Sequence, residues 1–289
     1  MRVFRMLPVC LAGMLLVACA TTPAPSVSPQ AATEAIPAHD NLNATIWMQS
    51  SAEYEATVRG IYANAERALD AALADPSWNA LPHGESGEGF ESKSPAIIVD
   101  ADETMIDNSP YQARSIRENR GYTAESWQAW VSARAARAMP GAVDFANYAK
   151  AHDVTIFFIT NRDAPAEYEA TVANLRALGF PIADDASNVV LRGDARAPGK
   201  EKGARRQWVG RTHRVVLMLG DNLADFLDGA GTDVAARQTL MAPYRDWWGQ
   251  RWFMLPNPAY GSWENAILRS CEAASSPRAC LREALQDKY

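Results

Sequence analysis

Acidic side chains occur in two close pairs, and each pair follows a largely apolar run. Asp100 and Asp102 come directly after the letters PAIIV, and Asp221 and Asp225 come after RVVLML and a glycine. A spacing of four puts Asp221 and Asp225 on one face if a helix begins there. Carboxylates gathered at one place repel each other, by about 4 kcal/mol for a pair 4 Å apart at an effective dielectric near 20. Either some of these carboxylates are protonated or a cation is bound, and an all-oxygen cluster suits Mg²⁺.

The elements that must position these groups are indicated by three runs that are apolar except for Thr155 and Arg214. Such runs are typical of strands that are buried on both faces of a parallel sheet. They cover residues 95–99, 154–159 and 214–219. Helical patterns over residues 140–152, 165–179 and 200–210 separate or follow them, which predicts a doubly wound α/β sheet. Ligands bind beyond the carboxyl ends of such strands, so we expect Asp100, Thr160 and Asp221 at one edge.

The rest of the chain supplies helices around this sheet. Residues 46–74 have the apolar spacing of an amphipathic helix. An insertion over about residues 107–139, which contains Trp127, is long enough to form a cap over the site. Residues 231–289 add a Trp-rich loop, a short strand near 252–255 and two helices.

Composition excludes several classes of protein. With 48% apolar and 21% charged residues, the chain of 289 residues is globular rather than disordered. Its net charge of −6 and the lack of a basic block argue against a partner that is a nucleic-acid polymer. The four histidines lack zinc-ligand spacing.

The N-terminus reads as an export signal. Residues 1–18 combine Arg2 and Arg5 with an apolar run of about 13 residues, whereas a membrane-spanning helix needs about 20. This predicts a signal peptide. The letters LVAC over residues 16–19 resemble the bacterial lipoprotein box, in which Cys19 becomes the lipidated N-terminus. The alternative is an ordinary signal peptide with a chance cysteine.

A tether follows the predicted lipidation site. Residues 19–44 are rich in Ala, Thr, Pro and Ser, which is typical of a flexible linker. By resemblance to Gram-negative lipoproteins, Ala20 favours sorting to the outer membrane. We therefore expect a protein of the cell envelope that contacts the membrane through its N-terminal lipid.

Cys271 and Cys280 flank a predicted turn between two helical stretches, so their sulfurs could meet. Disulfides persist in exported proteins, and a loop of this size would contribute about 2.5 kcal/mol. We predict a structural disulfide; the alternative is two free buried thiols.

Four motifs carry a resemblance to a known family. The segments IVDADETMIDNSPY, ITNR, KGARR and GDNLADF occur in this order. They resemble the haloacid dehalogenase superfamily, and within it the bacterial class C acid phosphatases with four signature aspartates, in particular the lipoprotein 5′-nucleotidase branch. The later letters PGAVDFANY and MLPNPAYGSWE fit the same resemblance, which covers the mature chain.

The resemblance implies a haloacid-dehalogenase-like Rossmannoid parallel sheet. Its helical cap would be formed by the insertion together with N- and C-terminal helices. The phosphatase domain would span residues 45–289, with its core over about 93–230 and a C-terminal helical segment over about 256–289.

The same resemblance implies catalytic roles. Asp100 matches the nucleophile that forms an aspartyl-phosphate, and Asp102 matches the general acid and base. Thr160 matches the hydroxyl that binds the phosphoryl group, and Asn161 offers further donors. A carboxylate nucleophile with a neighbouring carboxyl that moves the proton agrees with this chemistry.

Metal and phosphate ligands are implied in the same way. Mg²⁺ would be held by the Asp100 side chain, the Asp102 backbone carbonyl and Asp221, with Asp225 supporting the ligands. Lys200 and Lys202 both precede ARR. The family pattern resembles K-x-A-R-R, so Lys202 is expected to bind phosphate.

Trp127 and Tyr260 match two aromatic residues that sandwich a nucleoside base in the family. Stacking of this kind is worth about 1–3 kcal/mol per base. The alternative for both residues is core packing.

These features predict a Mg²⁺-dependent phosphomonoesterase that acts on nucleoside monophosphates and related phosphate monoesters. One alternative is a phosphotransferase that uses the same residues and passes the phosphoryl group to an alcohol. Another is a lipoprotein that binds a nucleotide without turnover.

Overall fold

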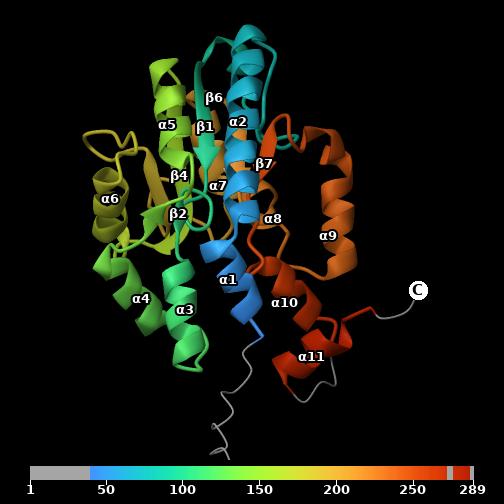
Figure 1. The fold of residues 1–289 in the computed structure, drawn as a ribbon. Helices are drawn as coiled ribbons and strands as arrows, with labels where there is room; N and C mark the ends of the chain where they lie inside the picture. Colours follow the sequence, from blue (N-terminus) through green and yellow to red (C-terminus); the bar gives the residue numbers. More distant parts are fainter. Residues whose placement is uncertain (1–39, 272–275, 287–289) are drawn as a thin grey trace, which may run out of the picture. The chain divides into compact units, whose positions relative to one another are not determined.

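The computed structural model describes residues 40–271 and 276–286. Its centre is a sheet of five parallel strands in the order β5-β4-β1-β6-β7 (Figure 1). The strands are β1 (Ser94–Val99), β4 (Thr155–Asp163), β5 (Val189–Arg192), β6 (His213–Gly220) and β7 (Trp252–Met254). The three strands predicted from the apolar runs are its three central ones, β4, β1 and β6, and the short strand expected near residues 252–255 is β7; this confirms the parallel α/β fold.

Both faces of the sheet are covered, as the apolar runs predict. Ile97 and Val99 pack into one core cluster, and Ala96 and Ile98 pack into the other, because successive side chains of a strand point to opposite faces. Helices α2 (Ala52–Ala74) and α5 (Ala142–Ala151) contact β6 and β4 within the first cluster. Helices α7 (Gly203–Gly210) and α8 (Leu223–Phe226) contact β6 on the other face.

The insertion between β1 and β4 forms a small helical unit. It comprises β2 (Ile106–Asp107), α3 (Ser109–Arg117), α4 (Ala124–Ala133) and β3 (Arg137–Ala138). Strands β2 and β3 pair antiparallel and close the unit at its base. Helices α3 and α4 lie beyond the carboxyl end of β1 (Figure 1), where a cap is expected.

Further helices lie before, between and after the strands of the sheet. They are α1 (Leu42–Ser50), α6 (Tyr168–Ala177), α9 (Val234–Met241), α10 (Ser262–Leu268) and α11 (Pro277–Glu283). Two 3₁₀ turns, η1 (Phe90–Ser92) and η2 (Ala242–Trp247), complete the elements. The predicted disulfide between Cys271 and Cys280 is present, with Cα atoms 5.7 Å apart, and it ties α11 to the end of α10.

Several predicted boundaries are wrong. The tether was expected to reach residue 44, but α1 already begins at Leu42. The helix predicted over 46–74 is interrupted at Ser51, whose hydroxyl accepts a hydrogen bond from Tyr54 N at 3.1 Å and so starts α2. The core extends beyond residue 230, because β7 pairs with β6 and belongs to the sheet.

The predicted signal peptide, Cys19 and most of the predicted tether lie outside the described residues, so export, lipidation and outer-membrane sorting stay predictions. Within the residues that the structure describes, no helix has the length and apolar character needed to cross a membrane.

Candidate active site

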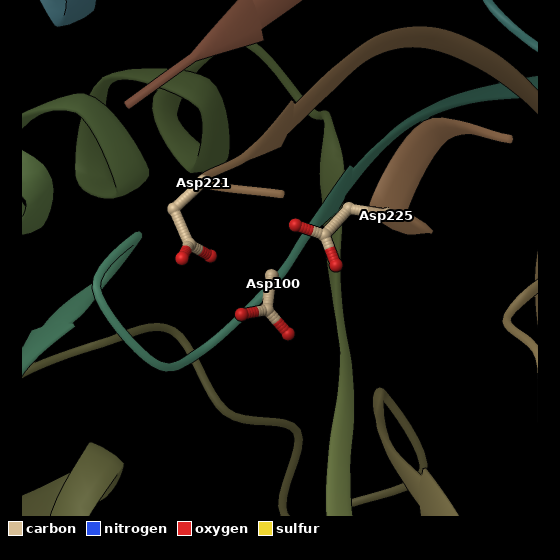
Figure 2. Close-up of side chains that lie close together, drawn as sticks. All are labelled: Asp100, Asp221 and Asp225. Carbon is tan, nitrogen blue, oxygen red and sulfur yellow. The ribbon is translucent and has the colours of Figure 1, made fainter. Parts of the chain in front are cut away.

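Three carboxylates from distant parts of the chain converge at the carboxyl edge of the sheet. Asp100 follows β1, Asp221 follows β6, and Asp225 lies in α8. One oxygen from each lies within 4.8 Å of the others. Figure 2 shows the three side chains pointing toward one another. The topology therefore brings together residues that are more than 100 positions apart in the sequence.

The turn after β6 explains why Asp225 reaches this cluster. Asn222 N donates to Asp225 Oδ2 at 2.9 Å, and the Asn222 side chain accepts from Ala224 N, which forms a capping box at the start of α8. A Cβ at position 220 would collide with the Asp225 carboxylate, so glycine is required there. The local sequence GDNLAD therefore builds half of the cluster by itself.

Lys202 supplies the positive charge of the site. Its buried Nζ contacts Asp100 Oδ1 and lies 2.8 Å from Asp225 Oδ1. Lys200 is exposed. The structure thus places Lys202 in the cluster and Lys200 outside it, which agrees with the prediction that Lys202 is the phosphate ligand.

Burial perturbs the acid groups strongly. Desolvation raises the pKa of Asp100 to about 7; Lys202 opposes the shift, and the charges of Asp225 and Asp102 add to it. Desolvation also raises the pKa of Asp221 well above its ordinary value, with further contributions from Asp225 and Asp100. The pKa of Lys202 is raised: burial lowers it, but Asp100 and Asp225 outweigh that effect. The single positive charge of Lys202 therefore does not balance the negative charges that the carboxylates of the cluster would carry when ionised.

The donor set fits a hard divalent cation. The three carboxylates of the cluster offer oxygen ligands, the type that Mg²⁺ and similar ions prefer. Asn257 Nδ2 donates to Asp221 Oδ2 at 2.8 Å and orients that carboxylate. Both oxygens of Asp225 already have partners, Lys202 and Asn222 N, which agrees with the predicted supporting role.

Asp102 lies beside this cluster and is paired with the guanidinium of Arg162. Arg162 Nη2 donates to Asp102 Oδ1 at 2.7 Å, and Arg162 Nε is 3.1 Å from both oxygens. The guanidinium is almost completely buried. Asn108 Nδ2 adds a hydrogen bond of 2.9 Å to Oδ1. The predicted acid and base is therefore held rigidly from two sides.

Thr160 and Asn161 lie at the end of β4. Thr160 Oγ1 is 3.4 Å from Asp102 Oδ2, so the predicted phosphate ligand lies next to the predicted acid. Arg205 donates to Thr160 O at 2.6 Å and to Asn161 Oδ1 at 2.7 Å. This buried arginine thus orients the strand end that carries both donors.

The two predicted aromatic residues border the same region. Trp127 is half-buried on α4, and the Arg162 guanidinium lies over its ring at 5.6 Å. The Tyr260 hydroxyl donates to Glu103, the neighbour of Asp102. Trp127 thus contacts Arg162 and Tyr260 contacts Glu103, and both of these residues adjoin Asp102. That the two rings sandwich a base stays a prediction.

Sequence reasoning missed four polar residues that organise the site: Asn108, Arg162, Arg205 and Asn257. Each lies inside a segment that carries the resemblance: Asn108 in IVDADETMIDNSPY, Arg162 in ITNR, Arg205 in KGARR and Asn257 in MLPNPAYGSWE. The available signal was a polar residue within a motif segment; of the four, only Arg162 lies directly beside a predicted ligand, Asn161. Which ligand each of them contacts depends on tertiary structure.

The raised pKa values predict how stability depends on pH. Besides Asp100, the fully buried Glu103 has its pKa raised to about 8, first by desolvation and then by the charge of Asp102. Without a divalent cation the folded protein therefore binds more protons than the unfolded chain between about pH 4 and pH 8, so its stability falls as pH rises through this window. We expect a lower melting temperature at about pH 8 than at about pH 5 in EDTA.

Glu103→Gln is the control for this experiment. It removes one of the two groups, so the melting temperature of the variant should change less between the two pH values. A melting temperature in EDTA that is equal or higher at the alkaline pH, for both proteins, would contradict the prediction.

Comparison with known proteins agrees with this geometry. The family model described as HAD superfamily, subfamily IIIB (acid phosphatase) matches residues 12–263. A structure of the class C acid phosphatase from Bacillus anthracis is 32% identical, with a TM-score of 0.72, over 86% of this chain and 98% of its own. A second structure of that enzyme, with tungstate bound, is also 32% identical, with a TM-score of 0.73 and the same coverage. The chain therefore belongs to subfamily IIIB of the HAD superfamily, the acid phosphatases, and is a phosphomonoesterase.

Proposed function

We propose that the protein is a Mg²⁺-dependent phosphatase of nucleoside monophosphates that works through a phosphoryl group on Asp100. The observation that carries this proposal is the convergence of Asp100, Asp221 and Lys202, with Asp102 two residues beyond the nucleophile. A cation and a lysine beside one carboxylate suit an attack on a negatively charged phosphoryl group.

The first step transfers the phosphoryl group. A carboxylate oxygen of Asp100 forms a bond to phosphorus while the bond between phosphorus and the ester oxygen breaks. Asp102 gives its proton to the departing oxygen, and the alcohol leaves. Lys202 offsets charge on the phosphoryl oxygens, and Thr160 donates a hydrogen bond to them.

The second step returns the enzyme to its initial state. Asp102, now ionised, accepts a proton from water, and the resulting hydroxide oxygen bonds to phosphorus. The bond between phosphorus and Asp100 breaks, which releases inorganic phosphate and leaves Asp102 protonated. Asp100, Asp221 and the Asp102 carbonyl would hold Mg²⁺, which when bound supplies charge stabilisation of the phosphoryl oxygens.

Two observations support the substrate class. Tungstate, bound in the Bacillus anthracis enzyme, is an oxyanion, as phosphate is. Trp127 and Tyr260 border the acid, where the alcohol part of the ester would lie. Stacking on such rings stabilises a bound base by about 1–3 kcal/mol, which favours nucleotides over simple phosphate esters.

The test is release of inorganic phosphate from a nucleoside monophosphate and from glycerol phosphate. We expect EDTA to lower activity at least about 100-fold and added Mg²⁺ to restore it. The nucleotide should have the higher kcat/KM by about 5- to 150-fold, from the stacking energy. Activity that is indifferent to EDTA would contradict the metal dependence.

Trp127→Ala should remove most of the preference for the nucleotide. Trp78→Ala is a matched control, because Trp78 is also half-buried beneath an arginine, Arg251 at 5.0 Å, while its indole donates to Val216 O in the sheet. Equal kcat/KM for both esters in the unmodified protein would rule out nucleotide selectivity and leave the phosphatase itself intact.

A further inference from the structure

Asn108 is a buried side chain with partners at both ends of its amide. Its Nδ2 donates to Asp102 Oδ1 at 2.9 Å and to Glu103 Oε2 at 3.2 Å. Its Oδ1 accepts from Trp130 Nε1 at 2.7 Å, with Arg162 Nη2 at 3.5 Å. These partners come from the loop after β1, from β4 and from α4. Asn108 therefore connects the predicted acid to the cap.

The partners determine which way this amide points. The indole of Trp130 and the guanidinium of Arg162 can only donate, so the atom of the Asn108 amide that faces them is its oxygen. A flipped amide would set its NH₂ against these two donors. The amide NH₂ of Asn108 is thus committed to Asp102 and Glu103.

The position of Asn108 in the chain argues against a purely local role. It is the N-cap residue of α3, where an asparagine side chain ordinarily accepts a hydrogen bond from the first turn, worth about 1 kcal/mol. Its side chain makes no such bond. The amide donates to Asp102 instead, so α3 lacks the side-chain cap that Asn108 could otherwise provide.

The two carboxylate oxygens of Asp102 have different hydrogen-bond partners. Oδ1 accepts from Asn108 Nδ2 and from both Nη2 and Nε of Arg162. Oδ2 accepts from Arg162 Nε at 3.1 Å, and its one other hydrogen-bond contact among the described residues is the long one of 3.4 Å to Thr160 Oγ1. One oxygen is anchored, and the other faces the hydroxyl predicted to bind the phosphoryl group.

We propose that Asn108 is a positioning residue that anchors Oδ1 of Asp102 to α4, through Trp130, and thereby aims Oδ2 at the ester oxygen of the substrate. The proposal rests on the proposed function, in which Asp102 protonates the leaving group. Helix α4 also carries Trp127, so the element expected to contact the base is the one that holds the proton donor in place.

The test is the dependence of kcat/KM on the leaving group, because this parameter reports the steps up to phosphoryl transfer to Asp100. Dinitrophenyl phosphate releases dinitrophenolate, a stable anion that needs no proton. Glycerol phosphate releases an alkoxide, which must be protonated as it leaves. We expect Asn108→Ala to lower kcat/KM about 100-fold for glycerol phosphate and less than about threefold for dinitrophenyl phosphate.

Trp130→Phe provides a second, milder variant. It removes the N–H that anchors Asn108 Oδ1 and keeps an aromatic ring in the core, so the same selectivity should appear with a smaller loss. Asn188→Ala is the matched control: Asn188 is also buried, and its Nδ2 donates to Ile156 O at 2.8 Å and Pro181 O at 3.0 Å. This control should show no selectivity between the esters.

An equal loss for both esters, or no loss, in Asn108→Ala and Trp130→Phe would overturn the proposal. If Asn108→Ala does not fold, Trp130→Phe decides alone. Asp102→Asn separates this failure from failure of the proposed function: if that variant also lacks selectivity for the leaving group, Asp102 is not the acid.

Discussion

Asp100→Asn should abolish turnover, with kcat/KM lower by at least about 10⁴-fold. The amide has no negative charge and does not form a transient bond to phosphorus. The substitution keeps the size of the side chain, and burial already favours the uncharged form of this group, whose pKa is raised to about 7. The variant should therefore fold, as measured by circular dichroism and thermal unfolding.

The direct measurement is trapping of the phosphoryl group. An acid quench with radiolabelled substrate should leave label on the unmodified protein and none on Asp100→Asn. Asp163→Asn is the matched control, since Asp163 also ends a strand, β4, but is exposed and paired with Arg192 at 2.6 Å. It should retain activity. Turnover by Asp100→Asn near that of the unmodified protein would remove the proposed mechanism.

Lys202→Met should lower kcat/KM by about 10²- to 10³-fold, the effect typical of losing one positioned donor. The substitution leaves Asp100 and Asp225 without their shared cation in the protein interior. Breaking a buried ion pair costs about 3–5 kcal/mol, so the variant measured in EDTA should also unfold at a lower temperature. Steady-state kinetics and thermal unfolding measure the two effects separately.

Lys200→Met is the control for this prediction, because Lys200 belongs to the same segment and is exposed. It should change neither activity nor melting temperature measurably. If Lys200→Met is the variant that loses activity while Lys202→Met keeps it, then Lys202 is a structural cation and the phosphate ligand has been assigned to the wrong lysine.

The central strands could be predicted because each is a short apolar run between polar segments. A short run of only apolar residues between polar segments must be buried on both faces, and parallel strands have that environment. The rule that such strands present their carboxyl ends at one edge then places Asp100, Thr160 and Asp221 together. The outer strand β5 was not predicted, because its four residues are too few for a period to be recognised. The short strand expected near residues 252–255 corresponds to β7.

The break between α1 and α2 at Ser51 could not be predicted from the sequence either. Apolar spacing continues from α1 into α2, so periodicity alone indicates one helix over residues 46–74. A serine hydroxyl that caps a new helix competes with continuation of the old one by about 1 kcal/mol. That difference is too small to be recognised without knowing where each helix packs.

From the amino-acid sequence by itself, the resemblance to a known family implied the types and the order of the predicted catalytic groups. Local burial and turn rules, which act over a few residues, indicated the strands that precede them. The tertiary structure decided which of two lysines enters the acidic cluster and which oxygen of Asp102 is anchored. Those outcomes depend on contacts between segments tens of residues apart, such as Arg162 with Asp102 and Asn108 with Trp130. No local rule specifies such contacts, because they form only when the insertion, the sheet edge and the C-terminal segment pack together.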